Sequence, residues 1–589
     1  MKSLKSKLKK GENGIIAVIY TAVLCGVLAY FFDYYYELND DYFIKNILSG
    51  VYSGTPSAHS IQMLYPLSLI LSLLYRINRN ISWFGLFLNL CQFGCIALVT
   101  ERILSFLTKK WTKAVVICVE TAFIATFLLR ELVFVQYTFT CALLAATAAF
   151  LLYTSRPADT VKQMIKKNRI SIVLAIIAFN VRSEMLLLVL PLICVAGLCK
   201  WATEKKFFTR ENAVKYFSVL GVVIAGLIIS YGIDLIAYSG ADWKEFRKFF
   251  DNRTELYDFQ TIPPYEGNEA FYESIGMAPE EQVLLVNYNF GIDEDINADK
   301  LGKIANYAKD QRKENMPSLV ETIKDIIKDY IYRTFHGIDT PWNLMTVSMY
   351  FLVLFCALCN RHFRFIWELV FMGFVRTGLW GFLLYRGRTP ERITYSMYLV
   401  EILILLGMLL EESRKEKLRG VFMSLFCCLI LVFSLKYMQT SITGQYQRYL
   451  RADNNNKRYE DLKVYVRENS KNYYFWDVAS FVGYSEKMFV NVDNSLMNLD
   501  IMGGWLYKSP LTREKLAAFG LDLTEDAILN GKNVYVIVAV KEREDAPCFV
   551  NWVTAYYAYR GEKITVEQTD SLYSDGEEIF KIYQVMPEL

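Results

Sequence analysis

Long apolar segments recur through the first 440 residues of this chain, and they limit its possible folds more than any other feature. A helix needs about 20 mostly apolar residues to cross a bilayer. Eleven stretches approach that length: 14–32, 81–106, 112–129, 131–153, 170–183, 185–200, 214–238, 342–360, 365–385, 393–411 and 420–438. The composition, 53% apolar and 15% aromatic, also excludes an ordinary water-soluble protein. We therefore expect a polytopic α-helical membrane protein with about eleven transmembrane helices.

The basic residues between these segments indicate the topology. Short loops rich in Lys and Arg stay in the cytoplasm, and the basic loops can all lie there only if segment 61–75 does not cross. Because this segment is short and begins near Pro66, we expect an interfacial helix. The basic N-terminus, residues 1–13, is then cytoplasmic and the C-terminus lies outside the cell. Segment 14–32 lacks a small-residue cleavage site, so we expect a retained first helix.

This topology divides the chain into three parts. The cytoplasmic residues 1–13 precede a transmembrane domain, 14–438, with an outer loop at 33–80 and a large outer loop at 239–341. In the large loop we expect helices around 298–314 and 318–332. The third part, 439–589, has β-rich runs at 473–476 and 534–540 and helical spacing at 458–467 and 549–559, which predicts an extracytoplasmic α/β domain. Basic loops are short and scattered, so the sequence gives no support for nucleic-acid binding.

An adjacent pair of carboxylates, Asp40 and Asp41, stands in the first outer loop. An aspartate with its usual pKa of about 3.9 is ionised at neutral pH and can accept a proton from an attacking hydroxyl. In an extended loop the two side chains would point in opposite directions. The pair could instead cap a helix at 42–48, a role compatible with catalysis. Asp40 and Asp41 are also the candidates for holding a divalent cation, although one short acidic cluster is weak evidence for such a site.

Several arginines lie on the outer side in this topology, where they oppose the usual charge rule: Arg182, Arg386, Arg388 and Arg392. Guanidinium groups bind phosphate through paired hydrogen bonds, so a lipid phosphate in the outer leaflet is their expected ligand. They could instead pair with Glu184, Glu391 or lipid headgroups for structural reasons. Weaker candidates for contact with a sugar or an acceptor are His59, Arg253 and Asp258.

Three features together resemble the GT-C glycosyltransferases, membrane enzymes that use polyprenyl-phosphate-linked sugars. They are Asn39–Asp40–Asp41, the following SGVYSGTPSAHSIQMLYPLSLILSLLY, and a helix break at Arg182-Ser183-Glu184. The resemblance covers roughly residues 10–240 in its motifs and the rest of the chain only in architecture. The chain has Asp-Asp where the family often has Asp-Glu. It has only His59 and Pro66 where some members have His-Pro-Pro or Lys-Pro, which leaves the donor sugar and the role of His59 open.

The resemblance implies transfer of a sugar from a polyprenyl-phosphate donor to an extracytoplasmic glycan, lipid or protein at a bacterial plasma membrane. Asp40 would be the general base, and the outer arginines would stabilise the departing phosphate. Two other classes stay open: a lipid-linked saccharide flippase or transporter, with its site near the membrane midplane, and a non-catalytic envelope-assembly protein. The enzyme hypothesis predicts that Asp40, Arg182 and the arginines at 386–392 converge on one outward-facing cavity.

Overall fold

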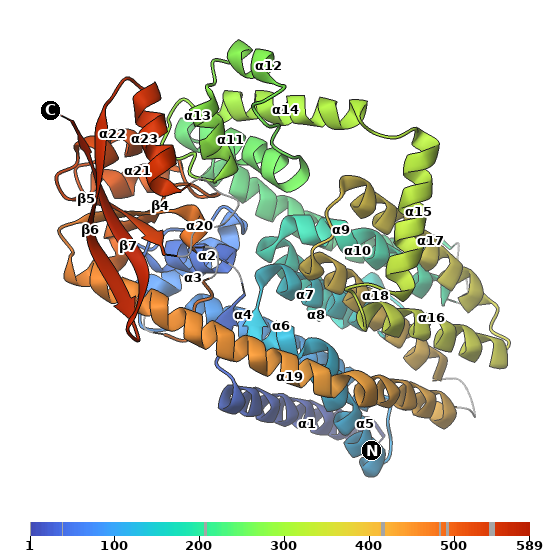
Figure 1. Cartoon of the computed structure of the whole chain (residues 1–589). Helices are drawn as coiled ribbons and strands as arrows, with labels where there is room; N and C mark the ends of the chain where they lie inside the picture. Colours follow the sequence, from blue (N-terminus) through green and yellow to red (C-terminus); the bar gives the residue numbers. More distant parts are fainter. Residues whose placement is uncertain are drawn as a thin grey trace.

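The computed structural model describes residues 2–37, 39–204, 209–413, 419–481, 484–490, 494–540 and 548–588. Helices dominate the described chain (Figure 1). Within it, nine helical stretches are long and apolar enough to span a membrane. They lie in α1 (Lys2–Phe31), α4 (Trp83–Ser105), the run α5 (Lys110–Phe123), η1 (Ile124–Leu128) and α6 (Leu129–Val133), α9 (Ser183–Ala202), α10 (Arg210–Ala237), α16 (Trp342–Cys359), α17 (Arg364–Arg386), α18 (Glu391–Ser413) and α19 (Arg419–Glu468).

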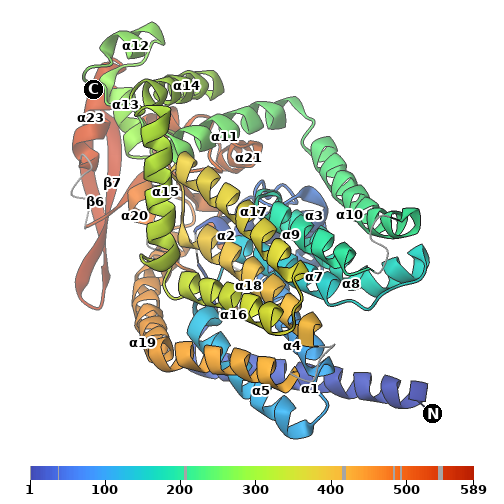
Figure 2. The same cartoon turned by 90° about the vertical axis from the view of Figure 1, so that its right-hand side faces the viewer.

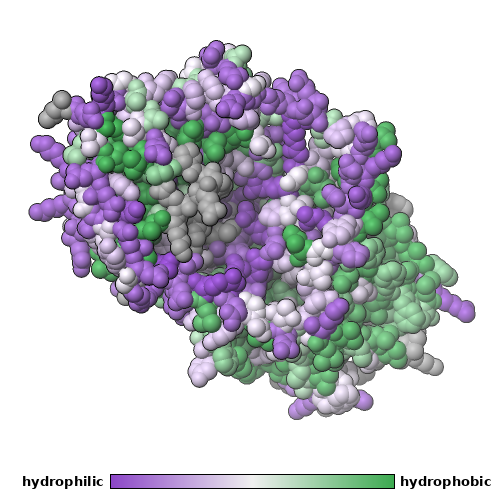
Figure 3. Space-filling model, in the orientation of Figure 1, coloured by the Kyte–Doolittle hydropathy of each residue, from purple (hydrophilic) through white to green (hydrophobic). Residues whose placement is uncertain are grey.

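Two of the eleven expected spans are helices that fall outside this set of nine. Helix α7 (Tyr137–Tyr153) has 17 residues and is almost wholly buried by its neighbours. Helix α8 (Val161–Val181) begins with a basic stretch that includes Lys162 and Lys166. The predicted class, a polytopic helical membrane protein with a sheet-containing C-terminal region, is confirmed. A broad apolar surface covers the helices at the lower right of Figure 3.

Helices α7 and α18 form the centre of the bundle. Helix α7 packs along α18 and contacts α4, α8 and α9, while α16 contacts the other side of α18. Small residues permit this close approach: α7 carries a run of alanines, and a Cβ added to Gly407 of α18 would lie 3.2 Å from the Tyr153 ring. The central helices therefore reach the outer loops from a rigidly packed base.

The first outer loop folds against the start of α7. Strand β1 (Tyr35–Tyr36) pairs in parallel with β2 (Phe134–Val135), and α2 (Asn39–Ser49) follows. Helix α3 (Tyr65–Ile77) has 13 residues and is therefore about 20 Å long, shorter than the roughly 30 Å of a bilayer's hydrocarbon. Its length fits the expected interfacial helix, whose side of the membrane stays a prediction.

The large outer loop contains five helices, and the two predicted at 298–314 and 318–332 are confirmed. They are α11 (Ala241–Phe259), α12 (Glu269–Ser274), α13 (Pro279–Val286), α14 (Ala298–Glu314) and α15 (Leu319–Phe335). Helix α15 stands between the outer helices and the apolar bundle (Figure 1).

The C-terminal region is built on a five-stranded sheet of order β4-β3-β5-β7-β6. Strands β4, β3 and β5 are parallel, and β7 and β6 continue the sheet antiparallel. The strands are β3 (Tyr473–Trp476), β4 (Leu499–Ile501), β5 (Val534–Ala539), β6 (Ile564–Ser574) and β7 (Glu577–Pro587); the helices are α20 (Val478–Phe481), η2 (Asn494–Asn498), α21 (Pro510–Ala517), α22 (Thr524–Asn530) and α23 (Phe549–Tyr559). The β-rich runs and the helix predicted at 549–559 are confirmed.

The two outer regions share one hydrophobic core. Phe290 and Leu301 of the large loop are buried in the same cluster as Phe475, Val536 and Tyr556 of the C-terminal region. Helix α19 joins this body to the bundle without interruption over 50 residues, as Figure 2 shows from the side. The expected boundary at residue 439 therefore falls inside a continuous helix.

Candidate functional site

The parallel pair of short strands places the acidic residues beside the N-terminus of α7. Because Tyr36 pairs with Val135, the chain beyond each strand runs on in the same direction. The backbone N–H of Tyr137 then donates to Asp41 Oδ1 at 3.0 Å. Asp40 and Asp41 both lie in the first turn of α2, so the loop is helical here, as in the alternative with a helix at 42–48, and not extended.

The two aspartates of the pair differ in environment. Asp41 is fully buried, and its Oδ2 has no hydrogen-bond partner. Burial raises its pKa well above the usual value, and the nearby charge of Asp40 raises it further. Asp40 is partly exposed, and its carboxylate makes no hydrogen bond or ion pair with any residue that the structure describes. Asp40 is thus the member of the pair that can meet a substrate.

Arg182 lies at the break between α8 and α9 and faces this pair. Its backbone is extended, with φ −157° and ψ 96°, which confirms the predicted helix break. Its Nη1 donates to the Tyr137 hydroxyl at 2.6 Å and to Gln62 Oε1, and its Nε lies 3.1 Å from Glu184. The carboxylates of Asp40 and Asp258 both lie within electrostatic range of its guanidinium. Arg182 is therefore fixed by neighbours and oriented toward the acidic loop.

Arg392, in the first turn of α18, completes the group. It is partly exposed, and its charge acts on both Asp41 and Tyr137. Within the described part of the chain its guanidinium has no hydrogen-bond or ion-pair partner. A guanidinium carries five N–H donors, so Arg392 is free to receive an anion.

A network of charges around Glu37 holds the start of α18 in place. Glu37 accepts from Arg130 at 2.8 Å and from Arg448 of α19 at 3.1 Å. Arg130 also pairs with Glu391, the residue before Arg392. The network therefore links the outer loop, α6, α18 and α19 at one point.

The other two outer arginines are paired with α11. Arg388 Nη1 lies 2.7 Å from Asp258 Oδ1, and Arg386 Nη2 lies 3.3 Å from Glu255 Oε2. Both guanidinium groups lie over the ring of Phe259. Arg386 and Arg388 therefore have structural partners, but these are Glu255 and Asp258 and not the expected Glu184 or Glu391. Among the described residues, Arg392 keeps its donors free.

The weaker candidates divide in the same way. The charge of Asp258 acts on Arg182, and Asp258 forms an ion pair with Arg388. His59 instead stacks on Trp243 at 4.5 Å between ring centroids, and burial lowers its pKa. Arg253 of α11 lies over Tyr257, and its buried Nε has no partner. Of these three, the structure brings Asp258 to the Asp40 group.

The residues around Asp40 do not form a grouped set of metal ligands. Among the described residues, the group of three or more closely spaced metal-type ligands is Glu281, Asp293 and Asp295, between α13 and α14. A divalent cation held by Asp40 and Asp41 stays a prediction.

Sequence reasoning missed Tyr137, Gln62 and the network around Glu37. A signal for Tyr137 was present: Arg130, Glu131 and Gln136 interrupt an otherwise apolar run, where the chain leaves the helix for β2.

Figure 3 shows a hydrophilic hollow between the C-terminal region and the apolar helices, in the orientation of Figure 1.

Comparisons with known proteins give a likeness in structure. No protein-family model matches the chain, and no curated protein matches its sequence. Two solved structures of ArnT from Cupriavidus metallidurans are similar to it, one bound to undecaprenyl phosphate and one in the apo state. Each alignment covers 96% of this chain and 97% of the other, with 10% sequence identity and a TM-score of 0.39. At that TM-score the likeness carries no argument about the residues or the activity of this chain.

Proposed function

We propose that this protein is a membrane glycosyltransferase of the GT-C type, which transfers a sugar from a polyprenyl-phosphate donor to an extracytoplasmic glycan, lipid or protein. The observation that carries the proposal is that two charged groups of opposite sign lie at one site without a hydrogen-bond or ion-pair partner among the described residues. The Asp40 carboxylate and the Arg392 guanidinium both lack partners among the described residues, and both lie around Asp41 and Tyr137. Unpaired opposite charges at one site suit a reaction that needs a base and a phosphate-binding group.

Asp40 accepts the proton of the acceptor hydroxyl as that oxygen attacks the anomeric carbon of the sugar. The bond from this carbon to the lipid phosphate breaks, and the phosphate leaves with the bonding electrons. Arg392 stabilises the charge that develops on the phosphate. Arg182, which is held in place by Tyr137 and Gln62, is the second guanidinium group at this site. Asp41 holds the loop against α7 through the Tyr137 N–H.

A lipid-linked donor would bind at the ends of the membrane-spanning helices. Arg392 is the second residue of α18 and Arg182 precedes α9, so both residues lie at the N-terminal end of an apolar helix. A polyprenyl chain would remain in the bilayer while its phosphate reaches this level. We place this end of the helices on the outer face of a bacterial plasma membrane.

Asp40→Asn tests the proposal because asparagine keeps the size of the side chain but cannot accept the proton. We expect the envelope glycan made by the wild-type strain to be lost, with the transfer rate reduced roughly 10²- to 10⁴-fold. The glycans of strains that express both proteins at equal levels are compared by mass spectrometry. Asp33→Asn is the matched control, because Asp33 is an exposed residue of the same loop that pairs with Lys487. Unchanged glycans in the Asp40→Asn strain would remove Asp40 as the base.

A further inference from the structure

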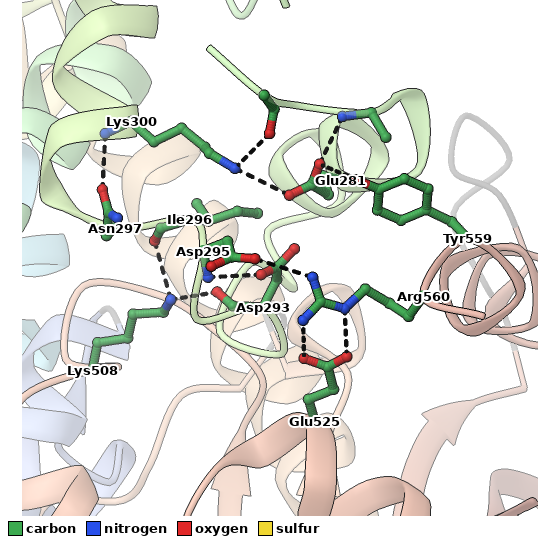
Figure 4. Close-up of polar contacts among 12 residues, drawn as sticks. Glu281, Asp293, Asp295, Ile296, Asn297, Lys300, Lys508, Glu525, Tyr559 and Arg560 are labelled. Atoms are coloured by element: carbon green, nitrogen blue, oxygen red, sulfur yellow. Dashed lines mark hydrogen bonds and ion pairs between the residues drawn. The ribbon is translucent and has the colours of Figure 1, made fainter. Parts of the chain in front are cut away.

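A second group of charges lies in the outer body, apart from the residues proposed for transfer. Glu281 of α13 and Asp293 and Asp295 of the loop before α14, called here the outer acidic cluster, have carboxylate oxygens within 4.8 Å of one another (Figure 4). Glu281 and Asp293 are buried, whereas Asp295 is exposed. Ionised carboxylates so close together repel each other unless something positive lies between them.

The hydrogen bonds of the cluster leave one buried oxygen without a partner. Glu281 accepts from the Ala278 N–H at 2.6 Å, from Lys300 at 3.2 Å and from the Tyr559 hydroxyl at 3.4 Å. Asp293 Oδ1 accepts from the Asp295 N–H at 2.8 Å, but its Oδ2 has no hydrogen-bond partner among the described residues, although Asp293 is fully buried.

A second unpartnered oxygen lies nearby. The hydroxyl of Tyr556, on the buried face of α23, has no hydrogen-bond partner within the described part of the chain and interacts electrostatically with Asp293. Buried polar atoms without partners are uncommon in folded proteins. Two of them beside three carboxylates indicate a ligand that offers positive charge.

The charge balance gives the size of that charge. Five carboxylates and three cationic groups contact one another here: Glu281, Asp293, Glu294, Asp295 and Glu525 with Lys300, Lys508 and Arg560. If all are ionised, a formal charge of −2 remains. The charge of Lys508 acts on Asp293, but its ammonium group donates to the backbone carbonyls of Asp293 and Ile296, and among the described residues it makes no hydrogen bond to the Asp293 carboxylate.

We propose that the outer acidic cluster binds one hard divalent cation, with Ca²⁺ as the best fit. Carboxylate oxygens in an irregular arrangement suit Ca²⁺ better than the strict octahedron that Mg²⁺ needs. Asp293, Asp295 and Asn297 follow the alternate spacing of acidic calcium-binding loops. The Asn297 side chain is already used, since it accepts from the Lys300 N–H at the start of α14. The three carboxylates therefore supply the protein ligands.

The cation would join the two outer regions at a point where they already meet. Asp295 accepts from Arg560, the residue after α23, at 3.0 Å, and Arg560 also pairs with Glu525 of α22. A cation held by Asp293 and Asp295 would fix this loop against the C-terminal helices. It would therefore act as a structural clamp, independent of sugar transfer.

The competing account is a proton shared between Glu281 and Asp293. Burial, together with the charge of Glu281, raises the pKa of Asp293 to about 6. A shared proton would balance part of the charge without a metal, and the protein would then take up no cation.

The test measures binding of radiolabelled Ca²⁺ to the full chain in detergent by equilibrium dialysis, after treatment with EDTA. We expect one Ca²⁺ per chain with a Kd of about 10⁻⁴ to 10⁻³ M, the range of extracellular calcium modules, and a Tm that rises with Ca²⁺ concentration. No saturable uptake by the wild-type chain up to about 5 mM Ca²⁺, well above that range, would overturn the proposal and favour the shared proton.

Two variants locate the site. Asp293→Asn and Glu281→Gln should each weaken Ca²⁺ binding at least tenfold, while Asp299→Asn should bind as the wild type does. Asp299 is a suitable control, because it is an exposed residue of the adjacent helix turn and pairs only with Lys248 among the described residues. In EDTA, Asp293→Asn should keep at least the wild-type Tm, since it removes a repelling charge beside Glu281. Equal binding by all four proteins would place the cation elsewhere and overturn the assignment.

Discussion

The Asp40 group and the outer acidic cluster each contain a buried carboxylate oxygen without a hydrogen-bond partner among the described residues, but they differ in whether a cationic group is left unpaired. Around Asp40, an arginine is left without a partner among the described residues, and the buried Asp41 is satisfied on one oxygen by a backbone N–H. In the outer acidic cluster the cations are committed, and a buried carboxylate oxygen is left over.

The difference indicates what each set can receive. A free guanidinium at the end of a span suits a phosphate, whereas surplus carboxylates suit a divalent cation. Both sites contain aspartate, lysine or arginine, and tyrosine, so their residue types do not distinguish them. The charges that remain unpaired do distinguish them.

The largest effect expected from a test of this comparison concerns Arg392. Arg392→Gln removes an unpaired guanidinium, and a hydrogen bond to a charged group contributes about 1.5–3 kcal/mol. Transfer from the lipid-linked donor should fall roughly 10- to 100-fold, measured as kcat/KM in a reconstituted membrane assay. Arg388→Gln should have a smaller effect, because Arg388 is paired with Asp258.

A control and a contrary result complete this test. Arg451→Gln removes an exposed arginine of α19 whose Nε bonds to its own helix, and it should transfer at the wild-type rate. If Arg388→Gln lowers kcat/KM as much as Arg392→Gln does, the pairing seen here does not decide which arginine receives the phosphate.

The second test compares the buried carboxylates Asp41 and Asp293. Asp41→Ala leaves the Tyr137 N–H without an acceptor, which should cost about 1–3 kcal/mol of unfolding free energy. Asp41→Asn keeps an acceptor and should cost less. Asp41 has a raised folded pKa, so its protonated form is favoured by folding. Stability of the wild type should therefore be highest below the unfolded pKa of about 3.9 and fall as the pH rises above it.

Thermal unfolding from pH 4 to pH 7 measures this dependence. Asp41→Asn should show a flatter Tm profile than the wild type, because it has no group to ionise at that position. A profile identical to the wild type would show that ionisation of Asp41 does not limit stability.

The smallest effect is expected for Tyr137→Phe. The variant keeps the backbone N–H that binds Asp41 and loses the hydroxyl, which accepts from Arg182 at 2.6 Å and donates to Gln62 Oε1 at 3.2 Å. Arg182 keeps Gln62 and Glu184 as partners. A lost hydrogen bond of this kind should cost about 0.5–1.5 kcal/mol, seen mainly as weaker binding of the donor with little change in Tm. A large fall in Tm instead would assign Tyr137 to the packing of α7.

Much of the fold could be predicted because it depends on local patterns. Local patterns predicted the strands at 473–476 and 534–540 and the helices α14 and α23. The polar residues at 182–184 indicated the break between α8 and α9. The shared core of the two outer regions is not visible in any local pattern, because Phe290 and Val536 meet only after the chain has crossed the bundle.

The candidate site was predicted in part for the same reason. Asp40, Arg182 and Arg392 could be selected by residue type and expected side of the membrane. The pairing of Arg388 with Asp258, 130 positions earlier, could not, since it depends on how α11 lies against the loop after α17. The contact of Tyr137 with Asp41 could not be predicted, because the short parallel strands that bring its N–H to that carboxylate lie in an apolar sequence without a strand pattern.

The unbroken helix α19 has a mechanical consequence. With 50 residues it is about 75 Å long, and its two halves belong to the apolar bundle and to the sheet-bearing body. If the half of α19 in the bilayer changes its tilt, the other end of the helix moves with it. The thickness of the bilayer would then set the position of the outer body relative to Arg392.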